Sequence, residues 1–193
     1  MNVKSVIKGI SRRIRLRGGR GREVRKKSVY RVLLSGGGIL RRRNFYEVSA
    51  VFLFAGIYNK SQLKDVLTTL TADFDTTYAL FIYGKNSYDL RDFKGRINPI
   101  TANRIVEGIK PTTWSLKEAL EYIYNTPKLK SFFNGSDILF LFVENLDEPI
   151  ILDLKIPEFV VILSERPINI STVSENDLRG KILKKGVFVG LQG

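Results

Sequence analysis

The stretch that decides the fold is Phe45 to Thr71, FYEVSAVFLFAGIYNKSQLKDVLTTLT. Its residues 48–54 are almost entirely apolar, which is typical of a strand that helices cover on both faces of a parallel sheet. A helix after the turn is predicted by apolar side chains at helical spacing: Leu63, Val66, Leu67 and Leu70. Ser61 is expected to cap its start. Because α/β folds bind ligands beyond the carboxyl end of such a strand, a site is expected at residues 55–60.

The rest of the chain continues the alternation of strands and helices, which predicts an α/β fold. Further strands are expected over residues 76–83, 87–90, 137–143, 149–154, 159–163 and 186–191. A helix is expected around residues 116–123, and another over 174–185 with Ser174 as its cap. Residues 97–110 are ambiguous, although Pro99 fits a first helical turn. Residues 125–134 are expected to form a loop.

Composition limits the chemistry available to the chain. Its 193 residues, 44% of them hydrophobic, can bury one good core. The sequence has no Cys and no His, which excludes disulfides, thiolate or imidazole catalysis and zinc sites of the usual ligand set. No apolar run reaches the length of a membrane span and no signal segment is apparent, so we expect a cytoplasmic protein without a membrane partner.

The net charge of +13 is concentrated at the N-terminus. Residues 1–43 contain 15 Lys or Arg and a single acid, Glu23, whereas the remainder has 17 basic and 18 acidic residues. We therefore expect two parts: a basic, Arg/Gly-rich arm over residues 1–44 and an α/β domain over residues 45–193.

The basic arm is a candidate for nucleic-acid binding, because like charge on a polar segment favours an acidic partner. Residues 17–22, RGGRGR, are similar to segments in which Gly spaces guanidinium groups that contact phosphates and stack on bases. The candidate contacts are Arg12, Arg13, Arg15, Arg17, Arg20, Arg22, Arg25, Lys26, Lys27, Arg41, Arg42 and Arg43. A solvated tail, or binding to an acidic protein surface, explains the same composition. A membrane-surface helix is disfavoured, because Ile7, Ile10 and Ile14 form only a thin apolar stripe.

The layout of residues 20–146 resembles the von Willebrand factor A (vWA) family, especially its CoxE-type members. There an Arg-rich stretch with a Gly-Gly turn precedes the first strand, as GREVR, YR and GGGILRRR do here. The likeness continues through LKDVLTTLT, TTYALFIYG, VEGIKPTTWSLKEALEYI and ILFLFVEN. The resemblance implies a Rossmann-like, three-layer vWA domain with a mostly parallel central sheet.

The family's metal-ion-dependent adhesion site is degenerate in this chain. That site holds Mg²⁺ through an Asp-x-Ser-x-Ser turn, a Thr and a later Asp, because the ion requires hard oxygen ligands. The positions of the first turn are Ala55, Ile57 and Asn59. The Thr position falls on Thr113, or on Trp114 if the alignment slips by one residue, and the late Asp position falls on Glu144. The expectation is therefore a site without a metal and a chain without a cofactor.

By resemblance, the function is that of a non-enzymatic adaptor that binds a protein partner, since CoxE-type proteins are thought to work beside MoxR-type AAA+ ATPases. The expected partner-binding rim consists of Tyr58, Asn59, Lys60, Thr113, Trp114 and Glu144. Trp114 is the only Trp and is either an exposed interface anchor or partly buried under a helix start.

Two other functions fit parts of the sequence. In the first, the protein belongs to an archaeal or viral nucleoprotein particle and binds RNA or DNA through the basic arm. In the second, it is a Mg²⁺-dependent nuclease, because Asp137 or Asp147 with Asp153 and Lys155 has the Asp…Asp-x-Lys form. That pattern is short and frequent by chance, so surface charge explains it better. The acids Glu144, Asp147 and Glu148 could chelate a cation but are more often simply solvated.

Overall fold

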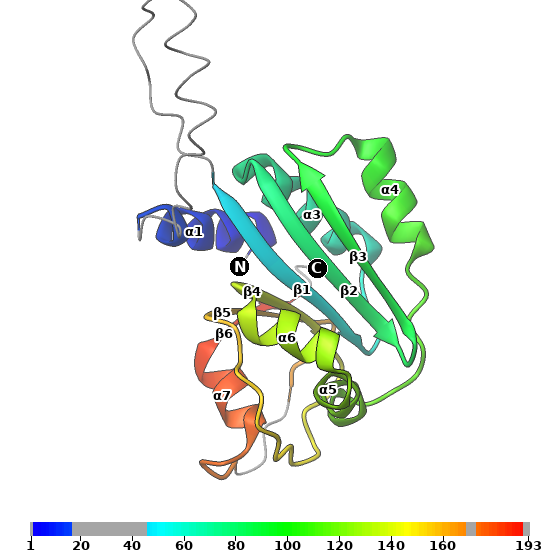
Figure 1. Cartoon of the computed structure of the whole chain (residues 1–193), viewed down its shortest axis with the longest axis vertical. Coiled ribbons are helices and arrows are strands. Elements are labelled where there is room, and N and C mark those ends of the chain that lie inside the picture. Colours follow the sequence, from blue (N-terminus) through cyan, green and yellow to red (C-terminus); the bar gives the residue numbers. More distant parts are fainter. Residues whose placement is uncertain (1, 17–45, 169–172, 191–193) are drawn as a thin grey trace, which may run out of the picture.

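A six-stranded sheet forms the centre of the molecule. The computed structural model describes residues 2–16, 46–168 and 173–190, to which all structural statements below refer (Figure 1). The strand order is β3-β2-β1-β4-β5-β6, and all neighbours are parallel except β2 and β3. The strands are β1 (Glu47–Ala55), β2 (Thr76–Gly84), β3 (Ser87–Lys94), β4 (Ile138–Val143), β5 (Phe159–Ser164) and β6 (Gly186–Gly190). The predicted α/β fold with a mostly parallel sheet is confirmed.

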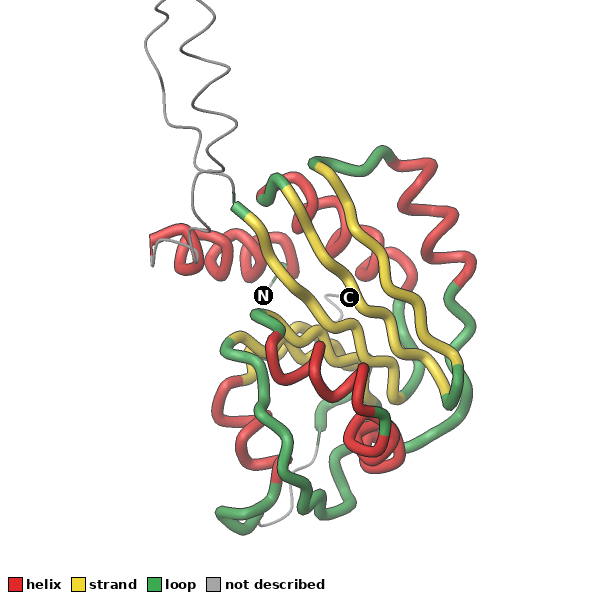
Figure 2. Tube along the Cα trace, in the orientation of Figure 1, coloured by secondary structure: helices red, strands yellow, loops and turns green. Residues whose placement is uncertain are grey.

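Helices cover both faces of this sheet and give three layers, as Figure 2 shows. One face carries α1 (Val3–Leu16), α3 (Lys60–Asp73) and α4 (Pro99–Gly108), and the other carries α5 (Leu116–Asn125), α6 (Pro127–Gly135) and α7 (Leu178–Lys185). Alternate residues of a strand point to opposite faces, so each inner strand contributes to two apolar cores. For this reason residues 48–54 are apolar except for Ser49, as expected from the sequence.

Stacked phenylalanine rings join the three central strands. Phe52 in β1 lies opposite Phe81 in β2 and Phe140 in β4, and its ring stacks on theirs at centroid distances of 4.7 and 4.9 Å. The ring of Phe54 stacks on that of Phe142 at 4.6 Å. These side chains fill the core beneath α3 and bring the carboxyl ends of β1 and β4 together.

The N-terminal helix α1 differs from the expectation that residues 1–44 form an arm separate from the core. Except for Leu16 at its end, its apolar side chains are buried in the same core as α3 and as Val161, Leu163 and Val189 of β5 and β6. Lys4 also pairs with Asp65 of α3 at 3.1 Å. Helix α1 therefore covers part of the sheet face that α3 also packs against. Residues 17–44 lie outside the described residues.

Three local predictions were wrong. Residues 127–135 form α6 rather than a loop, with Leu129 and Phe133 buried against the sheet. Residues 149–154 form part of the loop between β4 and β5 rather than a strand, with Ile150 and Leu154 buried in the core beneath α5, α6 and α7. Helix α7 begins at Leu178 with Asp177 as its cap, rather than at Ser174. The helices predicted from the apolar spacing of residues 63–70 and around residues 116–123 are confirmed as α3 and α5, and the ambiguous residues 97–110 contain α4, with Pro99 in its first turn. No helix in the described ranges has the length and apolarity needed to cross a membrane.

One buried hydroxyl in β2 gives a stability prediction. Thr77 is fully buried, and its Oγ1 is the one side-chain polar atom among the described residues that is buried without a hydrogen-bond partner. Replacing Thr77 by Val should therefore raise the free energy of unfolding by about 1 kcal/mol, since it removes an unsatisfied group at constant shape. Thermal unfolding should show a midpoint higher by roughly 2–4 °C.

Thr71 provides the matched control, because it is equally buried but its Oγ1 donates to the Leu67 carbonyl at 2.7 Å and accepts from the Ile97 amide at 3.2 Å. Thr71→Val should lower the midpoint. A lower midpoint for Thr77→Val would contradict the assignment of its hydroxyl as unsatisfied.

Candidate functional site

The candidate site lies at the carboxyl edge of the sheet between β1 and β4. From β1 the chain builds outward through β2 and β3 on one side, and β4 to β6 form the other side, so this is the point where the strand order reverses. Open α/β sheets bind their ligands in the crevice at such a point. Three loops meet here: residues 56–59 after β1, residues 112–115 before α5 and residues 144–148 after β4. Residues 55–60, which the sequence singles out, lie at this edge.

Two residues of the loop after β1 hold neighbouring helices. The side chain of Asn59 accepts hydrogen bonds from the amides of Ser61 and Gln62 at 2.9 and 3.1 Å, so Asn59, and not Ser61, caps α3. The hydroxyl of Tyr58 lies 3.0 and 2.9 Å from the carbonyl oxygens of Val106 and Ile109, to which it donates at the end of α4. Both predicted rim residues are thus engaged within the fold.

The pKa values of Tyr58 and Lys60 are both raised by their surroundings in this packing. Burial raises the pKa of the Tyr58 hydroxyl, the charge of Lys60 opposes this rise, and Glu107 adds to it. The ammonium of Lys60 lies 2.8 Å from the carboxylate of Glu107, a hydrogen bond that raises the pKa of Lys60. Both partners are exposed, so this ion pair contributes little stability. It fixes the start of α3 to α4.

Trp114 is half-buried, as one of the two interpretations of the sequence proposed. Its indole Nε1 donates to the carbonyl oxygen of Phe54, the penultimate residue of β1, at 2.6 Å. Its ring also lies against that of Tyr122, with 5.9 Å between the centroids. Thr113 beside it is exposed. Trp114 therefore ties the loop before α5 to the end of β1.

Glu144 closes over the loop after β1. Its Oε1 accepts a hydrogen bond from the Ile57 amide at 3.3 Å. The approach of the two loops depends on Gly56, since a Cβ at this position would lie only 2.9 Å from the backbone nitrogen of Glu144. Ile57 itself projects outward and is 62% exposed, although it lies in the middle of this edge.

The residues that align with the metal ligands of vWA domains do not fit a magnesium ion. Ala55 and Ile57 supply no side-chain oxygen, and the oxygen of Asn59 is used in the cap of α3. Glu144 accepts from a backbone amide instead. In the described part of the chain, no three acidic side chains gather closely enough to hold a metal ion.

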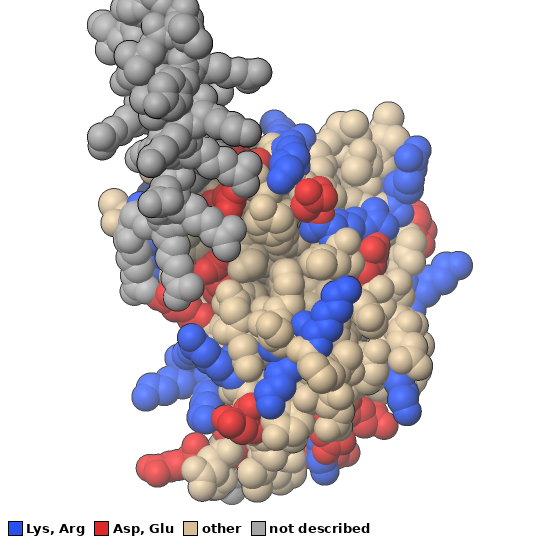
Figure 3. Space-filling view, viewed as in Figure 1, with Lys and Arg blue, Asp and Glu red and all other residues tan. Residues whose placement is uncertain are grey.

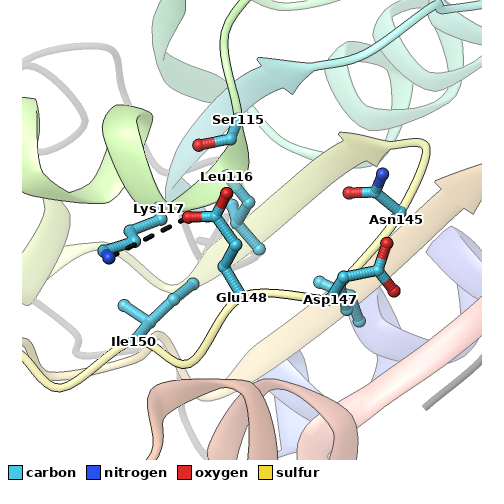
Figure 4. A pocket seen from close by; sticks show the side chains of 8 residues that line it. Ser115, Leu116, Lys117, Asn145, Asp147, Glu148 and Ile150 are labelled. Carbon is cyan, nitrogen blue, oxygen red and sulfur yellow. Dashed lines mark ion pairs between the residues drawn. The ribbon is translucent and has the colours of Figure 1, made fainter. Parts of the chain in front are cut away.

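A small hollow beside this edge is lined by five polar residues and by Leu116, Leu146 and Ile150 (Figure 4). Lys117 of α5 faces Glu148 across it at 3.9 Å. Asn145 and Asp147 lie on the opposite side, and Ser115 is committed to the capping box of α5 with Glu118. This set offers hydrogen-bond donors and acceptors but no nucleophile paired with a base. The hollow can therefore contact a polar group of a partner.

A buried ion pair beneath the hollow was not apparent from the sequence. Arg179 of α7 and its cap residue Asp177 are 3% and 2% exposed, and the guanidinium Nη2 lies 2.7 Å from the carboxylate. Nη1 of Arg179 donates to the carbonyl oxygens of Leu146 and Asp147 at 2.7 and 2.9 Å. The other carboxylate oxygen of Asp177 accepts from the Ile150 amide at 3.1 Å. The pair holds the loop after β4 in place.

Asp177 should make stability depend on pH. Burial raises the pKa of Asp177, but hydrogen bonds from Arg179 and from the Ile150 amide outweigh this and hold it below its ordinary value. The carboxyl group of Asp177 therefore binds its proton more tightly in the unfolded chain than in the folded chain. The stabilisation that ionised Asp177 gives is fully present above about pH 3.9 and is lost as the pH falls through the lower pKa of the folded chain. In urea unfolding, Asp177→Asn should destabilise the protein at pH 7, and this difference should shrink at pH 3. A difference that does not change with pH would contradict the prediction.

The two upstream carboxylates of the nuclease-like pattern, Asp137 and Asp147, lie at opposite ends of β4. The carboxylate of Asp137 lies at the amino end of β4, where it accepts hydrogen bonds from the backbone and the hydroxyl of Ser49, both at 2.9 Å. Asp147 follows the carboxyl end of the same strand, which is about 20 Å away at roughly 3.3 Å per residue. Asp153 and Lys155 are exposed on the loop that leads to β5. Asp137 and Asp147 therefore cannot bind one metal ion.

The described candidate nucleic-acid contacts lie on α1. Arg12, Arg13 and Arg15 are exposed on this helix. The guanidinium of Arg15 donates to the carbonyl of Asp73 at the end of α3 and lies 5.3 Å from the ring centre of Tyr46. The following candidates lie outside the described residues: Arg17, Arg20, Arg22, Arg25, Lys26, Lys27, Arg41, Arg42 and Arg43. On the view in Figure 3 the described domain carries both signs of charge interspersed.

In comparisons with known proteins, no family model, no curated protein and no solved structure matches this chain. The vWA resemblance is therefore neither supported nor opposed by them.

Proposed function

We propose that the chain is a vWA-like interaction module that binds a protein partner, without a metal ion, at the carboxyl edge between β1 and β4. The observation that carries this proposal is the exposure of Ile57, 62%, at the ligand-binding position of the fold. An apolar side chain surrounded by polar groups is the usual composition of a protein interface. Thr113, Asn145 and Glu144 supply such groups on the neighbouring loops.

The rigidity of the edge supports the same proposal. Trp114 bonds to β1, Glu144 to the loop after β1, and Arg179 to the loop after β4. A surface that is held in one conformation before binding loses little entropy when a partner docks. By resemblance to CoxE-type proteins, the proposed partner is a MoxR-type AAA+ ATPase. The internal bonds of Tyr58, Asn59 and Lys60 make them supports of this surface rather than its contacts.

The test replaces one exposed isoleucine at the carboxyl ends of the strands and another at the opposite, amino ends. Ile57→Asp places a charge in the proposed interface, and Ile100→Asp makes the same change at the start of α4, where Ile100 is 70% exposed at the other edge. Binding to purified MoxR-type ATPases of the source organism is measured by titration calorimetry. Ile57→Asp should weaken binding at least about tenfold, as expected for an interface anchor, and Ile100→Asp should not. Equal binding by both variants would overturn the proposal.

A second function is favoured by the surface of α1. Lys8, Arg12 and Arg13 are exposed on this helix, and no ion pair in the described ranges engages them. The helix leads directly into the Arg-rich residues 17–27. We propose that these cations together bind RNA or DNA through phosphate contacts, independently of the carboxyl edge.

The salt dependence of nucleic-acid binding tests this second function. Deleting residues 1–27 would also remove α1 from the core, so the test variant keeps α1 and changes six cations of the arm to Gln: Arg17, Arg20, Arg22, Arg25, Lys26 and Lys27. The control changes six exposed cations of the domain: Lys85, Arg96, Arg104, Lys110, Lys128 and Lys181.

Binding of a generic RNA and a generic duplex to the full chain should weaken steeply with salt. The arm variant should lower the slope of log K against log salt by about 0.7–0.9 for each phosphate contact it loses. The control, with the same net charge, should retain the slope. Equal slopes for the two variants would attribute any binding to net charge alone and would refute the arm as an anchor.

A further inference from the structure

The two outer edges of the sheet differ in their chemistry. Strand β3 carries four charged residues, which form two ion pairs along the strand: Arg91 with Asp89, and Lys94 with Asp92. Charges of this kind protect an edge strand against pairing with another chain. Strand β6, of sequence GVFVG, has no charge and no Pro, and its register with β5 is regular. In the described part of the chain β6 pairs with β5 alone.

Apolar side chains are exposed on both faces of β6. The register places Val187 and Val189 beside Val161 and Leu163, on the face of α1, and Phe188 beside Ile162, on the face of α7. Val187 and Phe188 are 36% and 43% exposed, whereas Val189 is buried. Each apolar layer therefore continues up to the outer edge of β6. Another strand placed there would bury both exposed side chains.

The sequence of β6 identifies which strand fits. GVFVG reads the same in both directions, so an antiparallel pair centred on Phe188 places identical residue types opposite each other. Gly186 lies opposite the second copy's Gly190, Val187 opposite its Val189, and Phe188 opposite its own copy. Side chains that are directly opposite lie on the same face about 4.5–5.5 Å apart. An interface with two-fold symmetry requires a surface that is complementary to itself in this way.

Charge also favours the antiparallel arrangement. Lys184 and Lys185 precede β6 and are exposed. In a parallel pair, the lysines of both copies would lie side by side. In the antiparallel pair they lie at opposite ends of the interface, about 20 Å apart at roughly 3.4 Å per residue, well beyond the screening length of about 8 Å at physiological salt.

We propose that β6 is a dimerisation strand, through which two copies of the chain join their sheets edge to edge about a two-fold axis at Phe188. The interface is one short strand and its flanking side chains, so the affinity is micromolar, as expected of small interfaces. The proposal does not depend on the function of the carboxyl edge or of the basic arm.

The first test measures the mass of the full chain by sedimentation at high salt, from about 1 µM to about 300 µM, a range that brackets micromolar affinity. The chain should change from monomer to dimer over this range. Phe188→Lys should remain monomeric, because it places two cations opposite each other. Leu90→Lys, at an exposed position on β3, should dimerise like the unchanged chain. A chain that is monomeric throughout, or a dimer that persists in Phe188→Lys, would overturn the proposal.

A charge exchange tests the register itself. Phe188→Lys and Phe188→Glu should each be monomeric alone, and an equal mixture should form a heterodimer, because residue 188 faces itself across the axis. Failure of the mixture to associate would overturn the proposed register.

A covalent trap covers the case in which these variants do not fold. The chain has no Cys, so Phe188→Cys introduces a single thiol. Opposite Cα atoms of an antiparallel pair lie about 4.5–5.5 Å apart, within the range of a disulfide. Mild oxidation should give a covalent dimer of Phe188→Cys and none of Leu90→Cys. Equal yields from the two variants would count against the proposal.

Discussion

Replacing Arg179 by Met should lower the free energy of unfolding by about 3–5 kcal/mol, the cost of leaving a buried charge without its partner. Arg179 is 3% exposed and is the cation that compensates the buried carboxylate of Asp177. Without its guanidinium, the carbonyl oxygens of Leu146 and Asp147 would also lose their donor. Urea unfolding at pH 7, followed by circular dichroism, measures the change.

Two further variants test whether this loss of stability comes from the buried ion pair. Lys181→Met removes an exposed cation from the same helix and should change stability by no more than about 0.5 kcal/mol. The double variant with Asp177→Asn should be more stable than Arg179→Met alone, because it removes the uncompensated charge while Oδ1 of residue 177 can still accept from the Ile150 amide. If Arg179→Met were as mild as Lys181→Met, the ion pair would not hold the loop after β4.

Replacing Ile7 by Ala should cost about 2–5 kcal/mol, as for other fully buried isoleucines. Ile7 lies in α1 with no exposed surface, within the core that α3 and the sheet share. This loss of stability is the sum of two contributions: the transfer free energy of the deleted side-chain atoms and the cost of the cavity left between the helix and the sheet. Thermal and urea unfolding should both show it, in a single transition with the rest of the domain.

The control for Ile7 is Leu16→Ala, at the end of the same helix, where the side chain is 86% exposed. Its effect should stay within about 0.5 kcal/mol. An Ile7→Ala variant as stable as Leu16→Ala would mean that α1 detaches from the domain, and deletion of residues 1–27 would then be a valid test of the arm.

Helix α1 shows why composition misled the sequence analysis. The apolar side chains of this segment are few, but four of them recur at helical spacing: Val3, Ile7, Ile10 and Ile14. Ile7, Ile10 and Ile14 are visible in the sequence as a thin stripe, but the charge of the first 43 residues as a whole favoured an arm over a core helix, although the cations of α1 all lie on its exposed side. Helix α6 was missed for a similar reason, because Leu129 and Phe133 are its only buried residues in a largely polar segment.

The sequence by itself determined the α/β class, the central strands and the position of the carboxyl end of β1. Uninterrupted apolar runs are stable only between two helical layers, and a strand followed by an amphipathic helix fixes where the first carboxyl end lies. Local spacing carries this information, so it can be read without knowing which segments become neighbours.

Tertiary structure alone decided what the site residues do. Trp114 bonds to the carbonyl of Phe54, and Arg179 to that of Leu146, across 60 and 33 residues of sequence. These bonds form because buried polar groups must find partners, and the partners are whichever groups the packing brings close. The same holds for residues 149–154, whose apolar sequence suits a strand but which form part of the loop between β4 and β5. Side-chain type is local, whereas the choice of hydrogen-bond partner depends on the whole fold.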